Sequence, residues 1–166
     1  MKELRTKSRI GALCVRKVGN RMSVQVNVSI VIPIFNEVES IEPLYEQLRQ
    51  VIHDDGRSYE IIFVDDGSRD GSLQKLCMLA STDSQVKVIQ LRRNYGQTAA
   101  MQAGLQMARG EVVVTMDGDL QNEPADIPMM VDKLAEGFDL IHGWRKDRKD
   151  NLLTRHVPSV VANWLL

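Results

Sequence analysis

Short apolar runs alternate along this chain with segments whose apolar residues recur at helical spacing, and this alternation limits the possible folds most. Runs typical of buried strands occupy residues 24–34, 59–64, 86–91, 112–116 and 138–141. Helical spacing is found between them, over residues 41–52, 73–80, 99–108 and 124–137. Strands that alternate with helices predict an α/β fold, with a mainly parallel sheet and helices on both of its faces.

The composition is that of one globular domain without a nucleic-acid partner. The chain has 166 residues, of which 43% are apolar and 26% are charged. A net charge of −1 and only 5% aromatic residues offer little attraction or stacking surface to a nucleic acid. No apolar stretch approaches the roughly 18 residues needed to span a bilayer.

The first residues differ in character from the rest. Residues 1–23 are basic, and their apolar part, residues 10–15, is too short for the core of a signal peptide. We expect a flexible basic leader over residues 1–23 and one domain over residues 24–166. Cys77 lies in a helical apolar pattern, which predicts a buried reduced thiol and favours a cytosolic compartment.

A polar cluster follows each predicted strand. The clusters occupy residues 33–37, 65–71, 92–96, 117–121 and 143–148. In open α/β sheets, ligands bind outside the carboxyl ends of the parallel strands, so these clusters are expected to converge at one edge. One such cluster alone is best interpreted as an ordinary loop, but five at one edge favour a binding site.

Asp117 and Asp119 come directly after an apolar run, with one residue between them. Side chains two residues apart in extended chain point the same way, so both carboxylates can face one ion. Carboxylates suit a hard cation such as Mg²⁺ or Mn²⁺, which also binds phosphate oxygens. The alternatives are a polar turn and, for Asp119, a structural salt bridge.

Four short motifs occur in order along the chain. They are Val31–Glu37, Val64–Ser68, Arg93–Gly96, and Asp117–Gln121 followed by Pro124. With these motifs the chain resembles a family 2 glycosyltransferase of the GT-A fold. Within that family it resembles the polyprenyl-phosphate sugar transferases, the group of dolichol-phosphate mannose synthase and the bactoprenol glucosyltransferases. The resemblance implies a Rossmann-like α/β/α sandwich and a site for a nucleotide sugar.

The resemblance also implies roles for individual residues. The donor nucleotide is expected to be bound by Pro33, Phe35, Glu37, Asp65, Asp66, Arg93 and Asp117. Of the adjacent aspartates, Asp66 is favoured for reading the base, and Asp65 for capping the turn. The aromatic face of Phe35 can stack on a base, and the alternative for Phe35 is core packing.

The expected catalytic residues are Asp117, Asp119 and Arg145. The resemblance implies Mg²⁺ or Mn²⁺ held by Asp119 and Gln121, and it implies that Arg145 and Arg148 bind phosphate. Arginine's planar fork suits phosphate oxygens, although without the resemblance this basic cluster is best interpreted as a solvated loop.

The implied reaction moves a sugar from a donor like UDP-glucose or GDP-mannose to polyprenyl or dolichyl phosphate. A phosphate monoester has a second pKa of about 6, so this acceptor is already charged at neutral pH and needs no strong base. We therefore expect direct displacement with inversion, at the cytoplasmic face of a membrane. The chain ends at Leu166, where the resembling enzymes continue, so we expect a C-terminally incomplete domain.

Other functions stay open at this point. One alternative is a non-catalytic fragment that binds a nucleotide sugar, and another is a family 2 transferase with a saccharide acceptor. A nicotinamide dehydrogenase is disfavoured, because no G-x-G-x-x-G follows the first predicted strand.

Overall fold

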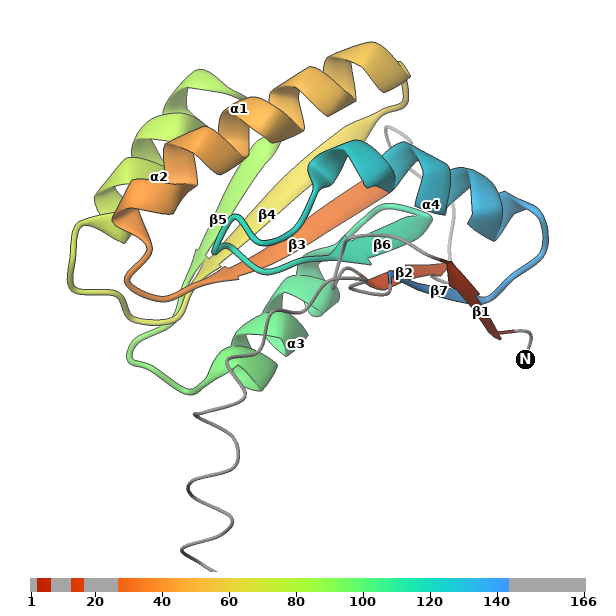
Figure 1. The fold of residues 1–166 in the computed structure, drawn as a ribbon. Helices are drawn as coiled ribbons and strands as arrows, with labels where there is room; N and C mark the ends of the chain where they lie inside the picture. Colours follow the sequence, from red (N-terminus) through yellow and green to blue (C-terminus); the bar gives the residue numbers. More distant parts are fainter. Residues whose placement is uncertain (1–2, 7–12, 17–26, 144–166) are drawn as a thin grey trace, which may run out of the picture.

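The central feature of the structure, a computed structural model, is one sheet. The structure describes residues 3–6, 13–16 and 27–143. Within them the strands follow the spatial order β1-β7-β2-β6-β3-β4-β5 (Figure 1). Their bounds are β1 Glu3–Thr6, β2 Leu13–Arg16, β3 Val28–Ile34, β4 Tyr59–Asp65, β5 Val86–Gln90, β6 Val112–Thr115 and β7 Leu140–Gly143.

The parallel part of the sheet consists of β6, β3, β4 and β5. β3 and β4 pair from Val28–Tyr59 to Ile34–Asp65. Every residue of β4 is buried, and so is every residue of β3 except the half-buried Pro33. Strands buried on both faces are typical of a parallel sheet covered by helices, so the prediction of a mainly parallel sheet is confirmed.

Two short strands come from the segment that precedes residue 24. β2 pairs antiparallel with both β6 and β7, and β1 pairs parallel with β7. The expectation of a flexible leader over residues 1–23 is therefore corrected at these two strands. Each has only four residues, and its partners lie roughly 100 to 140 residues away in the chain, so no local pattern indicates the pairing.

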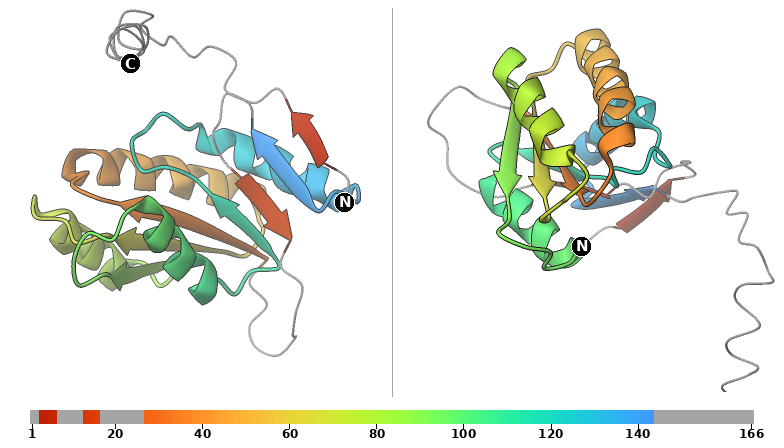
Figure 2. Two further views of the ribbon diagram at one scale, coloured as in Figure 1. Left: turned by 90° about the horizontal axis from the view of Figure 1, so that it is seen from below. Right: turned by 90° about the vertical axis from the view of Figure 1, so that its left-hand side faces the viewer.

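Helices cover both faces of the sheet. The helices α1 (Val38–Asp55), α2 (Ser72–Thr82) and α4 (Ile127–Ala135) lie on one face, and α3 (Gln97–Met107) lies on the other (Figure 1). The view from below in Figure 2 shows α3 on the near side of the sheet. The α/β/α arrangement expected from the sequence is thus confirmed.

The core is divided by the sheet because successive residues of a strand face opposite ways. Ile30 and Ile32 belong to the larger apolar cluster, under α1, α2 and α4. Val31 belongs to the smaller one, under α3. There Ala100 is fully buried, and a Cβ added to Gly104 would collide with the Val31 side chain, so α3 lies close to the sheet.

α1 begins at Val38, and the N–H and hydroxyl of Ser40 both donate to Glu37, the residue before the helix. One prediction on α2 needs correction. Cys77 is exposed, so the buried thiol expected there is wrong. Its neighbour Leu76 takes the buried position on α2 instead.

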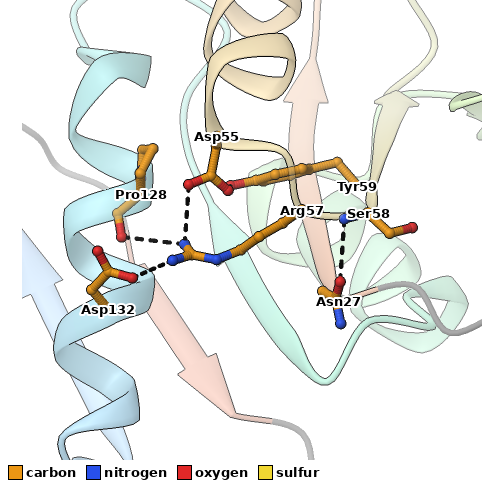
Figure 3. Close-up of polar contacts among 7 residues, drawn as sticks. All are labelled: Asn27, Asp55, Arg57, Ser58, Tyr59, Pro128 and Asp132. Atoms are coloured by element: carbon orange, nitrogen blue, oxygen red, sulfur yellow. Dashed lines mark hydrogen bonds and ion pairs between the residues drawn. The ribbon is translucent and has the colours of Figure 1, made fainter.

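Arg57 joins the turn after α1 to α4 (Figure 3). Its guanidinium donates to Asp132 and to the Pro128 carbonyl at 3.5 Å, and it lies 3.4 Å from a carboxylate oxygen of Asp55. Asp55 also accepts a hydrogen bond of 2.6 Å from the Tyr59 hydroxyl. Burial and this contact raise the pKa of Tyr59 above its usual value. These contacts therefore hold together the end of α1, the start of β4 and the helix α4, away from the carboxyl ends of the parallel strands.

The helices of the described residues are all too short or too polar to cross a lipid bilayer.

Candidate functional site

A pocket of about 340 Å³ opens at the edge where β3, β4 and β6 end. It is lined by residues from four loops and from the adjoining ends of β3 and α3: Pro33, Ile34, Phe35, Glu37, Asp66, Asn94, Gly96, Gln97, Asp117, Gly118 and Asp119. Six of the residues predicted for the site are among them, namely Pro33, Phe35, Glu37, Asp66, Asp117 and Asp119. The polar clusters after these strands thus converge as parallel topology requires.

The β3–α1 loop forms one wall of the pocket. Phe35 is 45% exposed, which excludes the alternative that it packs in the core. Asn36 adopts a left-handed φ of 55°, and its side-chain oxygen accepts a hydrogen bond of 2.8 Å from the Arg69 N–H. The Glu37 N–H donates to the Ser72 hydroxyl at 3.0 Å. The wall is therefore tied to the β4–α2 loop beside it.

The adjacent aspartates after β4 face different partners. Asp65 is fully buried and accepts from the Ser68 N–H at 3.3 Å, so it caps the turn and does not line the pocket. Asp66 is 3% exposed and lines the pocket. Its two carboxylate oxygens accept from the N–H groups of Tyr95 and Gly96, each at 2.8 Å. Asp66 therefore anchors the β5–α3 loop as well as facing the pocket.

The β5–α3 loop lies across Gly67. Gly67 has a φ of +75°, and a Cβ there would lie 2.6 Å from the backbone carbon of Arg93. Arg93 itself is exposed and outside the pocket lining, with its guanidinium 4.9 Å from the centre of the Tyr95 ring. The structure thus does not bring Arg93 together with the other predicted donor residues.

Two carboxylates line the pocket after β6. Asp117 is half-buried and accepts a hydrogen bond of 2.6 Å from the Gln97 side-chain amide. Asp119 is exposed, and one of its oxygens accepts from the Gln121 N–H at 3.0 Å. Between residues 27 and 143, Asp119 makes no ion pair, so the salt-bridge alternative finds no support. The side chain of Gln121 does not line the pocket.

The pocket residues fit a divalent cation that is shared with a ligand. No group of three or more His, Cys, Asp or Glu side chains among the described residues is placed to hold a metal ion. Mg²⁺ commonly binds through one or two carboxylates together with phosphate oxygens of a substrate and water. Asp117 and Asp119 supply such a pair in one pocket, so a phosphate-bearing ligand would complete the coordination.

Gln97 lines the pocket but was not among the predicted site residues. Its place as the first residue of α3, after a loop at a strand end, is only a weak positional signal, since many helix N-termini face no ligand. Arg145 and Arg148 lie outside the described residues, so their expected roles stay predictions.

Comparison with known sequences identifies the relatives of this chain. The family model "Glycosyl transferase family 2" matches residues 29–164. Dodecaprenyl-phosphate galacturonate synthase of Rhizobium johnstonii is 46% identical over 143 residues, which are 85% of this chain and 42% of the relative. Undecaprenyl-phosphate 4-deoxy-4-formamido-L-arabinose transferase of Pseudomonas aeruginosa is 43% identical over 82% of this chain and 40% of its own length. The chain thus spans about two fifths of these relatives.

Solved structures of other proteins share the fold of this chain. Glucosyl-3-phosphoglycerate synthase of Mycobacterium tuberculosis, in complex with Mn²⁺, UDP and glucosyl-3-phosphoglycerate, superposes with a TM-score of 0.52 at 26% identity. The match covers 66% of this chain and 39% of that protein. TarS of S. aureus has a TM-score of 0.51 at 28% identity, over 57% of this chain and 28% of its own.

Proposed function

The chain belongs to glycosyl transferase family 2, and from this premise we propose that its pocket binds the donor of a sugar transfer to polyprenyl phosphate. The observation that carries the proposal is the convergence of the motifs: residues of all four line one pocket of about 340 Å³. A volume of this order suits a small-molecule ligand.

The nucleotide of the donor is proposed to lie along the β3 and β4 side of the pocket. The exposed ring of Phe35 offers a face for a base, and Glu37 offers a carboxylate for ribose hydroxyls. Asp66 remains the proposed base-reading residue. Each carboxylate oxygen can accept a second hydrogen bond besides those from Tyr95 and Gly96, so anchoring the loop does not prevent contact with a ligand.

The diphosphate is proposed to lie on the β6 side, where Asp117 and Asp119 hold Mg²⁺ or Mn²⁺. A similar solved protein, the M. tuberculosis synthase, contains both Mn²⁺ and UDP, which supports this assignment. The cation, when bound, stabilises negative charge on the departing nucleoside diphosphate. Asp117 and Asp119 would hold the cation through their carboxylates, and Arg145 and Arg148 are proposed to bind phosphate oxygens.

The acceptor is proposed to be a polyprenyl phosphate, because both relatives quoted above carry dodecaprenyl or undecaprenyl phosphate in their names. Such an acceptor is ionised at neutral pH, so positioning and charge stabilisation suffice for direct displacement with inversion. A lipid acceptor also places the reaction at a membrane surface, which we propose to be the cytoplasmic face.

Transfer of a labelled sugar to lipid tests the proposed function. The chain is incubated with undecaprenyl phosphate, Mn²⁺ and radiolabelled UDP-glucose, GDP-mannose or UDP-galacturonate, and the organic phase is counted. We expect label to enter the organic phase with one donor, with an inverted anomeric centre, and to disappear in Asp119→Ala. Donor binding without lipid product would favour the binding-fragment alternative, and a labelled saccharide would favour the saccharide acceptor. A retained configuration would contradict the displacement mechanism.

A further inference from the structure

Gln97 contacts Asp117, the first of the two pocket carboxylates in the loop after β6. Its side-chain amide nitrogen lies 2.6 Å from Oδ1 of Asp117, and both residues line the pocket. Gln97 begins α3 and Asp117 lies in the loop after β6, twenty residues further along the chain. Hydrogen bonds to an ionised acceptor are about twice as strong as neutral ones, so this contact can select one orientation of the Asp117 side chain.

The backbone that carries Gln97 is held from both sides. The preceding residue, Gly96, donates its N–H to the nearly buried Asp66, and so does Tyr95. The helix that follows is held against the sheet by Ala100, which is fully buried, and by Gly104. The Gln97 amide is therefore presented to Asp117 from a backbone that is held on both sides.

We propose that Gln97 is a positioning residue, which holds the Asp117 carboxylate in the orientation that receives the cation and the donor; this rests on the function proposed above. The amide is a neutral donor, so it orients Asp117 without cancelling the negative charge that attracts a cation. A lysine at this position would also orient Asp117, but its charge would repel the cation.

Three variants separate orientation from charge. Gln97→Met keeps the size of the side chain and removes the donor, and Gln97→Lys keeps a donor and adds charge. Gln102→Met is the matched control, because Gln102 is also exposed on α3 and does not line the pocket. Two quantities are measured: the side-chain rotamer of Asp117 from NMR three-bond couplings without ligand, and the affinity for Mn²⁺ with UDP, from the electron paramagnetic resonance of free Mn²⁺.

The proposal predicts one Asp117 rotamer in the wild type, in Gln97→Lys and in Gln102→Met, and averaged rotamers in Gln97→Met. Affinity for Mn²⁺ and UDP should fall about tenfold in Gln97→Met, the effect of one hydrogen bond to a charged group, and at least as much in Gln97→Lys. An unchanged single rotamer in Gln97→Met would overturn the proposal. If the wild type binds no nucleotide, the proposed donor site is refuted. In that case, Asp117 rotamers that are averaged only in Gln97→Met would still support the positioning of Asp117 by Gln97.

Discussion

Asp66 and Asp119 both line the pocket, but they differ in what else depends on them. Asp66 is nearly buried and accepts hydrogen bonds from the N–H groups of Tyr95 and Gly96, whereas Asp119 is exposed. A hydrogen bond to a charged group contributes about 1.5–3 kcal/mol, whereas surface substitutions usually stay within about 0.5 kcal/mol. Removal of the Asp66 side chain should therefore destabilise the protein much more than removal of the Asp119 side chain.

Asp66→Ala is expected to lower the free energy of unfolding by about 2–4 kcal/mol, because two backbone donors lose their acceptor. Asp119→Ala should leave it unchanged within about 0.5 kcal/mol. Urea unfolding of both variants measures the difference, with the exposed Asp139→Ala as control. Equal stability of Asp66→Ala and the wild type would show that Asp66 does not anchor the loop.

Glu60 is a buried carboxylate at the amino end of β4, far along the strand from the pocket. It accepts hydrogen bonds from Lys87, from the Ser29 hydroxyl at 2.5 Å and from the Arg109 N–H at 2.6 Å. Burial acts to raise the pKa of Glu60, but these three contacts together hold it below the ordinary value. An acid with a depressed pKa stabilises the fold when it is ionised.

Glu60→Gln should therefore destabilise the protein at pH 7, by about 1–3 kcal/mol, and the deficit should shrink on acidification. The stabilising contribution is complete above the unfolded pKa of about 4.3 and is lost as pH falls through the lower folded value. Unfolding free energies of wild type and variant between pH 7 and pH 3 measure this, with exposed Glu123→Gln as control. A deficit that stays constant with pH would contradict it.

The loops at the carboxyl ends of the strands depend on close backbone contact. Gly67, at the end of β4, and Gly56, after α1, have nearly equal positive φ values of +75° and +69°. They differ in surroundings, since a Cβ at Gly67 would meet the Arg93 backbone, whereas nothing lies within 4 Å at Gly56. The pair thus separates the effect of backbone conformation from that of contact.

Gly56→Ala is expected to cost about 1 kcal/mol, the usual penalty for a left-handed alanine. Gly67→Ala should cost at least about 2 kcal/mol more, because the β5–α3 loop must move away. The same displacement should weaken nucleotide binding, since Asn94, Gly96 and Gln97 line the pocket from that loop. Thermal unfolding and nucleotide titration of both variants measure this, and equal losses in the two would rule out the contact.

Much of the fold was predictable where periodicity is strong and local. The parallel strands and four helices follow from their apolar patterns, because each buries a face against a neighbour in the predicted order. β1 and β2 were not predicted, because a strand of four residues shows too little apolar pattern and both strands pair with distant parts of the chain. The prediction that Cys77 is buried was wrong, because one step along a helix turns a side chain from the core toward solvent.

The candidate site was predictable in outline and not in its contacts. Because the carboxyl ends of parallel strands meet at one edge of the sheet, residues 33–37, 66, 94–96 and 117–119 were expected there, and the pocket contains residues from each of these segments. The anchoring of the β5–α3 loop by Asp66 joins it to Tyr95, 29 residues further along the chain, so the sequence does not encode this contact locally. Gln97 was missed because a glutamine at the start of a helix has no distinctive chemistry until its partner, Asp117, is known.

The whole molecule thus combines a sheet held by its core with a pocket whose walls come from four loops. Its proposed use, binding a nucleotide sugar through a divalent cation, is tested most directly by calorimetric titration. UDP, UDP-glucose and GDP-mannose are titrated with and without Mn²⁺ into the wild type, Asp119→Ala and Asp139→Ala. We predict Mn²⁺-dependent binding of one nucleotide class that is retained in Asp139→Ala and lost in Asp119→Ala. Binding that is independent of Mn²⁺ and of Asp119, or no binding by folded wild type, would contradict the account.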